Sequence, residues 1–158
     1  MIYRVIIPMV PRPQDRPRLA TIAGHARAYK TKGSYQWEAA VAFYLDQVLP
    51  PSVLTGAVRV DVCCVYHRPA YMSKPSKKTG GLLGGYSGGR EWKTDRPDLD
   101  NDLKSVFDAM KARWRDDCQW CLGVVAKVYA ALGEMPHVEV VIRQDLGDPR
   151  ETWERWTA

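Results

Sequence analysis

The residues of this chain that could perform chemistry gather where one predicted helix begins. Asp98 and Asp100 stand two residues apart directly after Pro97, and Lys104 follows Asp100 by four residues. Alternate residues of an extended backbone point the same way, so both carboxylates can converge on one ion, and Lys104 shares the helical face of Asp100. Hard oxygen ligands suit Mg²⁺ or Mn²⁺, which can activate water and neutralise the charge that builds on a phosphodiester.

These residues also fit an ordinary structural role. Asp98 or Asp100 could cap the helix, and Asp102 could be a favourable charge in its first turn. A further interpretation is that three charged residues, spaced four apart, form ion pairs on an exposed face of the helix: Asp100, Lys104 and Asp108. A cap needs one carboxylate, whereas three stand within five residues, and this excess slightly favours a metal site.

A second acidic pair, Asp116-Asp117, stands immediately before the next predicted strand. We expect this pair to return beside the start of the helix, close to Asp98 and Asp100. The simpler interpretation is a turn.

Positive charge is concentrated in two segments. The net charge is +5, yet residues 1–32 carry seven Lys or Arg against one Asp, and residues 67–97 carry seven against two acids. Both segments are rich in Pro or Gly and contain aromatic residues, which favours a nucleic acid over an anionic membrane surface, because each neutralised phosphate releases counterions. The candidate phosphate contacts are Arg12, Arg16, Arg18, Arg27, Lys30, Lys32, Lys74, Lys77, Lys78, Lys93 and Arg96.

Hydrophobic periodicity predicts a single α+β domain, a mixed β-sheet with two helices packed on it, in the order β-α-β-loop-α-β-β. The expected strands are 2–7, 57–66, 122–131 and 137–144, and the expected helices are 34–49 and the segment after Pro97. The segment between the first strand and the first helix contains four prolines, which exclude a helix there. Residues 8–32 should therefore be an extended basic arm. Residues 68–97 should form a mobile Gly-rich basic loop, with six of the twelve glycines within 80–89.

Length and composition narrow the class of protein. The 158 residues suit one domain, predicted to run over 1–145 with a polar C-terminal tail at 146–158. No apolar run approaches the ~18 residues of a membrane span, and no signal peptide is recognisable, so we expect a cytoplasmic protein without a membrane partner. The four cysteines make no disulfide framework, and Cys118-Gln-Trp-Cys121 is weak support for zinc or redox chemistry.

One motif resembles a known family. The chain reads Asp98-Leu99-Asp100-Asn101-x-x-Lys104-x-x-Phe107-Asp108-Ala109 and then Asp116-Asp117-x-Gln119. This pattern resembles the RusA family of Holliday junction resolvases, and the proline-rich basic run from Pro11 to Arg18 is similar to the arm of its phage-type members. Element order and length also fit, so the likeness covers most of the chain.

The resemblance implies a small homodimeric, Mg²⁺-dependent endonuclease that resolves four-way DNA junctions by paired symmetric nicks in DNA recombination and repair. It implies that Asp98, Asp100 and Asp117 are catalytic metal ligands and that Lys104 is the essential lysine. Lys127 matches a further basic position and joins the candidate DNA contacts. The implied location is a bacterial cell, with a phage or prophage origin as one option. Asp102 departs from the family pattern, where an apolar residue usually follows Asn.

Two hypotheses follow. The first is the junction-resolving endonuclease, in which Mg²⁺, or Mn²⁺ in its place, is held by the three carboxylates. The alternative is a non-catalytic module on the same fold that binds branched or single-stranded DNA, with the acidic cluster reduced to a cap and a solvated face. The presence of all three carboxylates and the lysine favours the endonuclease hypothesis, because a module that only binds DNA need not retain these four residues.

Overall fold

The computed structural model describes residues 1–15, 18–22, 25–52, 54–114, 117–144 and 146–157. Side chains lie outside that description at Arg18, Ile22, Ala28, Asp117, Trp156 and Thr157.

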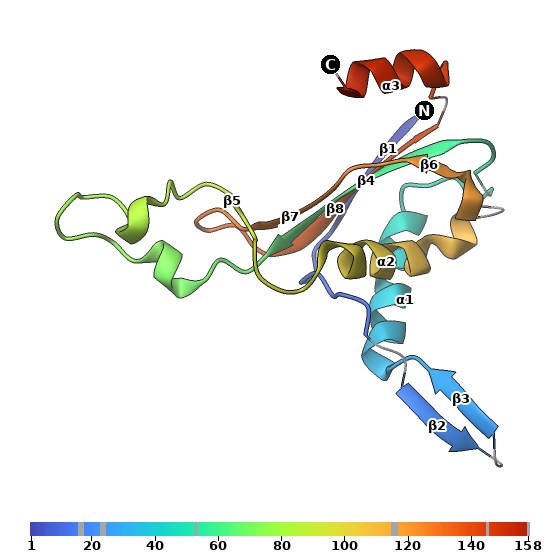
Figure 1. Cartoon of the computed structure of the whole chain (residues 1–158), viewed down its shortest axis with the longest axis horizontal. Coiled ribbons are helices and arrows are strands. Elements are labelled where there is room, and N and C mark those ends of the chain that lie inside the picture. Colours follow the sequence, from blue (N-terminus) through green and yellow to red (C-terminus); the bar gives the residue numbers. More distant parts are fainter. Residues whose placement is uncertain (16–17, 23–24, 53, 115–116, 145, 158) are drawn as a thin grey trace.

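A mixed β-sheet forms the centre of the molecule (Figure 1). Its strand order is β1-β8-β4-β7-β5, and β6 pairs with the first part of β4. The bounds are β1 Ile2–Ile7, β4 Val58–Tyr66, β5 Glu91–Trp92, β6 Trp120–Leu122, β7 Val125–Tyr129 and β8 His137–Gln144. Strand β4 runs parallel to β6 and β7 and antiparallel to β8.

Two helices cover one face of this sheet. These are α1 (Lys32–Asp46) and α2 (Leu99–Met110), which lie on the same side of it (Figure 1). Alternation along β4 places Val58, Val60 and Val62 in the core beneath them, each at most 2% exposed. The predicted single-domain α+β architecture with a mixed sheet is confirmed.

The predicted strand at 122–131 is interrupted near its start. Gly123 separates β6 from β7, and a Cβ placed at this glycine would lie 2.2 Å from the backbone oxygen of Val60. Only a residue without a Cβ allows β4 and this segment to approach so closely. The pairing register shifts beside it, between Val58 and Arg59.

The structure has a third helix that the sequence patterns did not predict. It is α3 (Pro149–Thr157), in the segment expected to be a polar tail, and it lies beyond the sheet from α1 and α2 (Figure 1). The Asp148 carboxylate accepts a hydrogen bond from the Arg150 backbone N–H at 2.7 Å. Asp148-Pro149 is therefore a capping residue followed by proline at the first helical position, a recognisable signal.

The predicted extended arm is partly wrong, because half of it is a β-hairpin. Strands β2 (Arg18–Ile22) and β3 (His25–Tyr29) pair antiparallel in a sheet of their own. The prolines that argued against regular structure all precede residue 18, so nothing prevents the later residues from pairing. The hairpin projects away from the central sheet beside the start of α1 (Figure 1).

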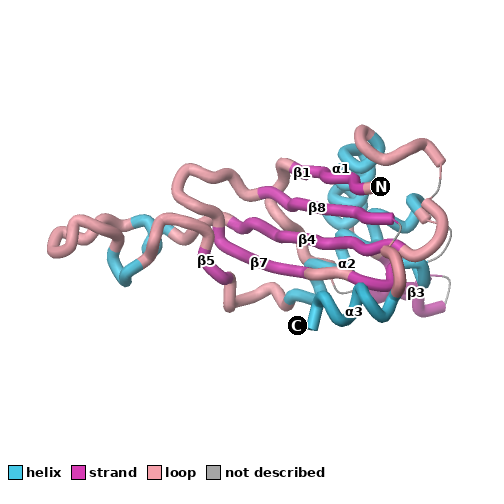
Figure 2. The backbone as a smooth tube through the Cα atoms, turned by 90° about the horizontal axis from the view of Figure 1, so that it is seen from above, coloured by secondary structure: helices cyan, strands magenta, loops and turns pink. Residues whose placement is uncertain are grey.

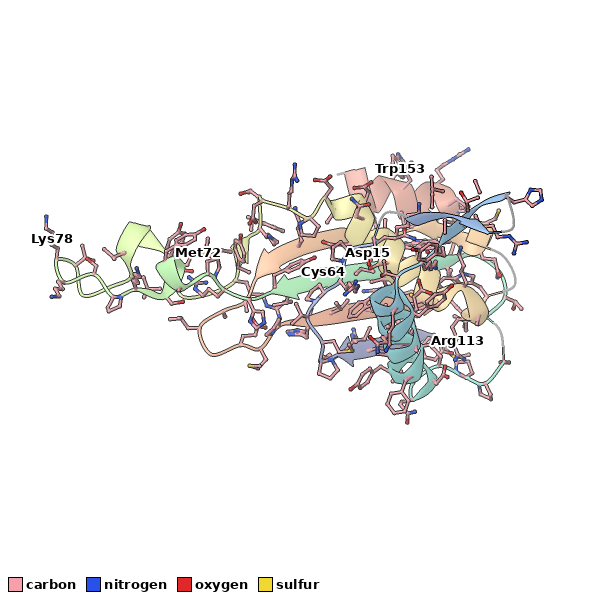
Figure 3. All side chains as sticks on the ribbon, turned by 90° about the horizontal axis from the view of Figure 1, so that it is seen from below. Asp15, Cys64, Met72, Lys78, Arg113 and Trp153 are labelled. Atoms are coloured by element: carbon pink, nitrogen blue, oxygen red, sulfur yellow. The ribbon has the colours of Figure 1, made fainter. Side chains whose placement is uncertain are left out.

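The basic loop at 68–97 forms a long extension at the opposite end of the molecule from the hairpin (Figure 2). It contains two short 3₁₀ turns, Ala70–Ser73 and Leu83–Gly85. Arg68 holds the base of this loop in place, since the Arg68 guanidinium donates to the backbone oxygens of Gly89, Ala130 and Met72. Lys78 lies at the tip (Figure 3).

Among the described residues, no helix has the length and apolar character needed to cross a membrane. The homodimer and the domain boundary at residue 145 stay predictions.

Candidate functional site

Two carboxylates and a lysine stand free at the start of α2. Asp98 occupies the N-cap position, but its side chain makes no capping hydrogen bond. Asp98, Asp100 and Lys104 are exposed, and within the described residues none of their side chains makes a hydrogen bond or ion pair. The side-chain capping interpretation of Asp98 is therefore not supported.

The exposed charge ladder of Asp100, Lys104 and Asp108 does not form either. Asp108 turns away from Lys104 and accepts from Gln14 at 2.7 Å, from Lys30 at 3.0 Å and from Lys111 at 3.0 Å. Burial would raise the pKa of the Asp108 carboxyl, but the bonds and charges of Lys30 and Lys111 lower it overall. Asp100 and Lys104 are left available for a ligand.

The segment before α2 is held in place by two lysines. Lys127 in β7 donates to the backbone oxygen of Asp95 at 2.6 Å and to that of Pro97. Lys93 donates to the Asp95 carboxylate at 2.5 Å, which lowers the pKa of that carboxyl to about 2. The backbone that leads into Asp98 is thereby fixed to the edge of the sheet.

Lys93 is itself enclosed by aromatic rings. Its ammonium lies 5.1 Å from the ring centroid of Tyr66 and 5.0 Å from that of Tyr129, and its side chain is 6% exposed. Cation–π attraction and the Asp95 ion pair compensate this burial. Lys93 thus has a structural role, and its DNA contact stays a prediction.

Asp102 does not add its charge to the exposed carboxylates. The residue is 1% exposed, and its Oδ1 accepts from the Tyr66 hydroxyl at 2.5 Å, while its Oδ2 is buried and has no hydrogen-bond partner among the described residues. Burial raises the pKa of the Asp102 carboxyl, and the charges of Lys127 and Lys93 oppose that shift. The residue that departs from the family pattern faces the core beneath the site.

Asp117 lies at the other end of α2 from Asp98. Its backbone is in the short turn Asp117–Gln119, before β6, which pairs with the beginning of β4. The start of α2 is instead tied to β7, which pairs with the end of β4. The 12 residues of α2 span about 18 Å, so within one chain the Asp117 backbone does not lie beside the helix start, where the acidic pair was expected. Asp116 and the Asp117 side chain lie outside the described residues.

The beginning of the arm adjoins the free carboxylates. The Gln14 backbone N–H donates to the Asn101 oxygen at 3.0 Å. An open hollow of about 590 Å³ lies there, and its lining residues are Pro13, Gln14, Arg96, Pro97, Asp98 and Asn101. A carboxylate and an exposed guanidinium thus border one space.

The donor chemistry of this place fits a hard divalent cation. Asp98 and Asp100 offer oxygen ligands that form no ion pair within the described residues, and two carboxylates with substrate oxygens are a common Mg²⁺ shell. Within the described part of the chain, no three His, Cys, Asp or Glu side chains come close enough to hold a metal by themselves. A third protein ligand would have to come from elsewhere.

The candidate DNA contacts divide into two groups. Arg27, Lys32, Lys74, Lys77, Lys78 and Arg96 are exposed. Arg12 donates to Asp15 at 2.7 Å, Lys30 pairs with Glu38 and Asp108, and Lys127 binds backbone oxygens, so all three already serve the fold. Arg16 and the Arg18 side chain lie outside the described residues. Sequence reasoning missed the supporting roles of Gln14, Tyr66 and Asp95, for which no local pattern gave a signal.

The sequence that builds this fold and its acidic cluster matches a family of DNA-cleaving enzymes. The model of the family described as endodeoxyribonuclease RusA matches residues 8–143. The chain belongs to this family, and its predicted resemblance is confirmed. It is also 32% identical over 139 residues to the uncharacterized protein YqaN of Bacillus subtilis (strain 168), covering 85% of this chain and 90% of that protein.

Proposed function

We propose that this chain is a divalent-metal-dependent endonuclease that resolves four-way DNA junctions by paired nicks as a homodimer. The observation that carries the proposal is the free pair Asp98 and Asp100, with Lys104 beside it, in a member of an endodeoxyribonuclease family. Mg²⁺ is the proposed cofactor, and Mn²⁺ could substitute, since both accept oxygen ligands.

In this mechanism Asp98 and Asp100 would hold the cation at the start of α2. When bound there, it would supply activation of water and neutralisation of charge on the phosphoryl oxygens. Lys104 stabilises the charge that develops on the phosphate or orients the attacking water. Arg96, exposed beside Asp98, neutralises an adjacent phosphate, and the two bonds from Lys127 keep Asp98 in position.

The two basic projections suit a branched substrate. The hairpin and the loop at 68–97 extend from opposite ends of the molecule (Figure 2), so one chain can contact phosphates on both sides of its cutting site. The exposed Lys74, Lys77 and Lys78 belong to the loop. A four-way junction has two-fold symmetry, and a two-fold dimer offers two equivalent sites for the two nicks.

A nicking assay on a fixed four-way junction, beside a linear duplex of the same sequence, tests the function. We expect symmetric nicks in the junction with Mg²⁺, no nicks with EDTA, and no cutting of the duplex. Tight junction binding without nicking under Mg²⁺ or Mn²⁺ would contradict the enzyme and support the binding module. Failure to bind the junction would exclude both.

The position of Asp117 gives the homodimer a specific role under this proposal. Because its backbone lies at the far end of α2 from Asp98, a second copy is the arrangement that could bring Asp117 to the site. We therefore infer that each cutting site combines Asp98 and Asp100 of one chain with Asp117 of the other.

Mixing two inactive variants tests this shared site. Asp100→Asn and Asp117→Asn are each expected to be inactive alone, but subunit exchange should produce dimers with one intact site, which nick one strand of the junction. The readout is nicking by the mixture after exchange, compared with each variant alone. If exchange occurs and the mixture stays inactive, each site is built from a single chain.

A further inference from the structure

Strand β3 alternates between two kinds of residue. Its sequence is His25-Ala26-Arg27-Ala28-Tyr29, with long polar or aromatic residues at odd positions and alanine at even positions. Successive residues of a strand point to opposite faces, so His25, Arg27 and Tyr29 share one face of the hairpin. All three are exposed.

The residues of β2 separate onto the same two faces of the hairpin. Across the strands, Arg18 lies opposite Tyr29, and Ala20 lies opposite Arg27. The opposite face carries Leu19 and Thr21, which are exposed and uncharged. The hairpin therefore has one basic, aromatic face, which we call the H-R-Y face (His25, Arg27, Tyr29), and one uncharged face.

The base of the hairpin is joined firmly to the helices. Asp15 on the incoming side accepts from Arg12, from the Thr31 hydroxyl and from the Ser34 hydroxyl, and these contacts lower the pKa of the Asp15 carboxyl. On the outgoing side, the Lys30 ammonium bonds to Glu38 at 2.7 Å and to Asp108 at 3.0 Å. Both ends of the hairpin are thus anchored to the first part of α1, and the outgoing end is also bonded to Asp108 of α2.

A two-stranded ribbon that packs on nothing is marginally stable in water. This one nevertheless keeps its cationic and aromatic side chains on a single exposed face, close to the helix that carries the free carboxylates. Packing in a protein core does not explain why these side chains gather on one exposed face, whereas binding to a polyanionic partner does. The major groove of B-DNA is wide enough to admit a two-stranded ribbon between its phosphates.

We propose that the β2–β3 hairpin lies along one duplex arm of the branched substrate, with the H-R-Y face toward the DNA and the Leu19 face toward solvent. Arg27 contacts a phosphate, and Tyr29 packs on the sugar–phosphate backbone at the base of the hairpin. This inference rests on the proposed function, because it assigns a part of the DNA substrate to a part of the chain.

Two exposed residues on opposite faces provide a matched test. Arg27→Ala should weaken junction binding several-fold and lower the dependence of log K on log salt by about one per contacted phosphate, whereas Thr21→Ala should change neither. Binding is measured by fluorescence anisotropy in EDTA, so that no cutting intervenes. Equal effects from both variants, or no effect from Arg27→Ala, would overturn the assignment of faces.

A proximity measurement separates DNA contact from contact with a second copy. The photocrosslinker p-benzoylphenylalanine at position 29 should attach to labelled junction DNA on irradiation, and the same group at position 19 should not. Attachment of position 29 to another protein chain instead of DNA would overturn the proposal. If the wild-type protein nicks the junction but position 29 never reaches DNA, the hairpin proposal fails alone. If the wild-type protein neither binds nor nicks, the proposed function fails.

Discussion

Replacing Asp100 with asparagine is expected to lower the rate of junction nicking by about 10²-fold or more, the scale of losing one group that stabilises the transition state. Asparagine keeps the size of the side chain but loses the negative charge, and a neutral amide is a poorer ligand for a hard cation than a carboxylate. Asp98→Asn should behave in the same way. Initial rates of nicking at saturating Mg²⁺ measure the effect.

Junction binding in EDTA should be retained or slightly strengthened in both variants, because each removes a negative charge that faces the phosphates. The melting temperature should also be unchanged, since the side chains of Asp98 and Asp100 are exposed and, among the described residues, make no hydrogen bond or ion pair. Glu154→Gln, which removes an exposed carboxylate in α3, is the control with normal nicking. A normal nicking rate in Asp100→Asn would show that the site has been placed wrongly.

The central sheet and its two covering helices could be predicted because their residues repeat with a regular period. Valines at every second position of β4 and the apolar stripe of α2 report burial on one face directly. The four prolines exclude a helix only up to Pro17, and they do not indicate whether the residues after it pair as strands, so the hairpin does not follow from them. The helix α3 was missed because its composition is polar, although Asp148-Pro149 marks its start.

The candidate site was predictable only where its residues are neighbours in sequence. The grouping of Asp98, Asp100 and Lys104 follows from local spacing. The position of Asp117 depends on which end of β4 each later strand joins, which no local pattern reports. The enclosure of Lys93 by Tyr66 and Tyr129 is likewise a product of sheet pairing, so composition alone does not report the structural contacts of this lysine.

Lys127 distinguishes a positioning residue from a phosphate contact. Its ammonium binds the backbone oxygens of Asp95 and Pro97, directly before Asp98. Lys127→Met keeps the length of the side chain but removes both bonds, so the backbone at Asp98 should shift. A displacement of about 1 Å can cost about 10²-fold in rate, and we expect nicking at saturating DNA to fall by about 10- to 100-fold.

The Mg²⁺ dependence of nicking and the salt dependence of junction binding identify why Lys127→Met loses activity. If Lys127 positions Asp98, the variant should need several-fold more Mg²⁺ for half-maximal nicking, and high Mg²⁺ should restore part of the rate. Its salt dependence of junction binding should equal that of the wild type, since no phosphate contact is lost. Lys77→Met, in the exposed loop, should show the reverse: normal Mg²⁺ dependence and a shallower salt dependence. If Lys127→Met instead follows the Lys77→Met pattern, Lys127 contacts DNA directly, and the bonds to Asp95 and Pro97 are secondary to that contact.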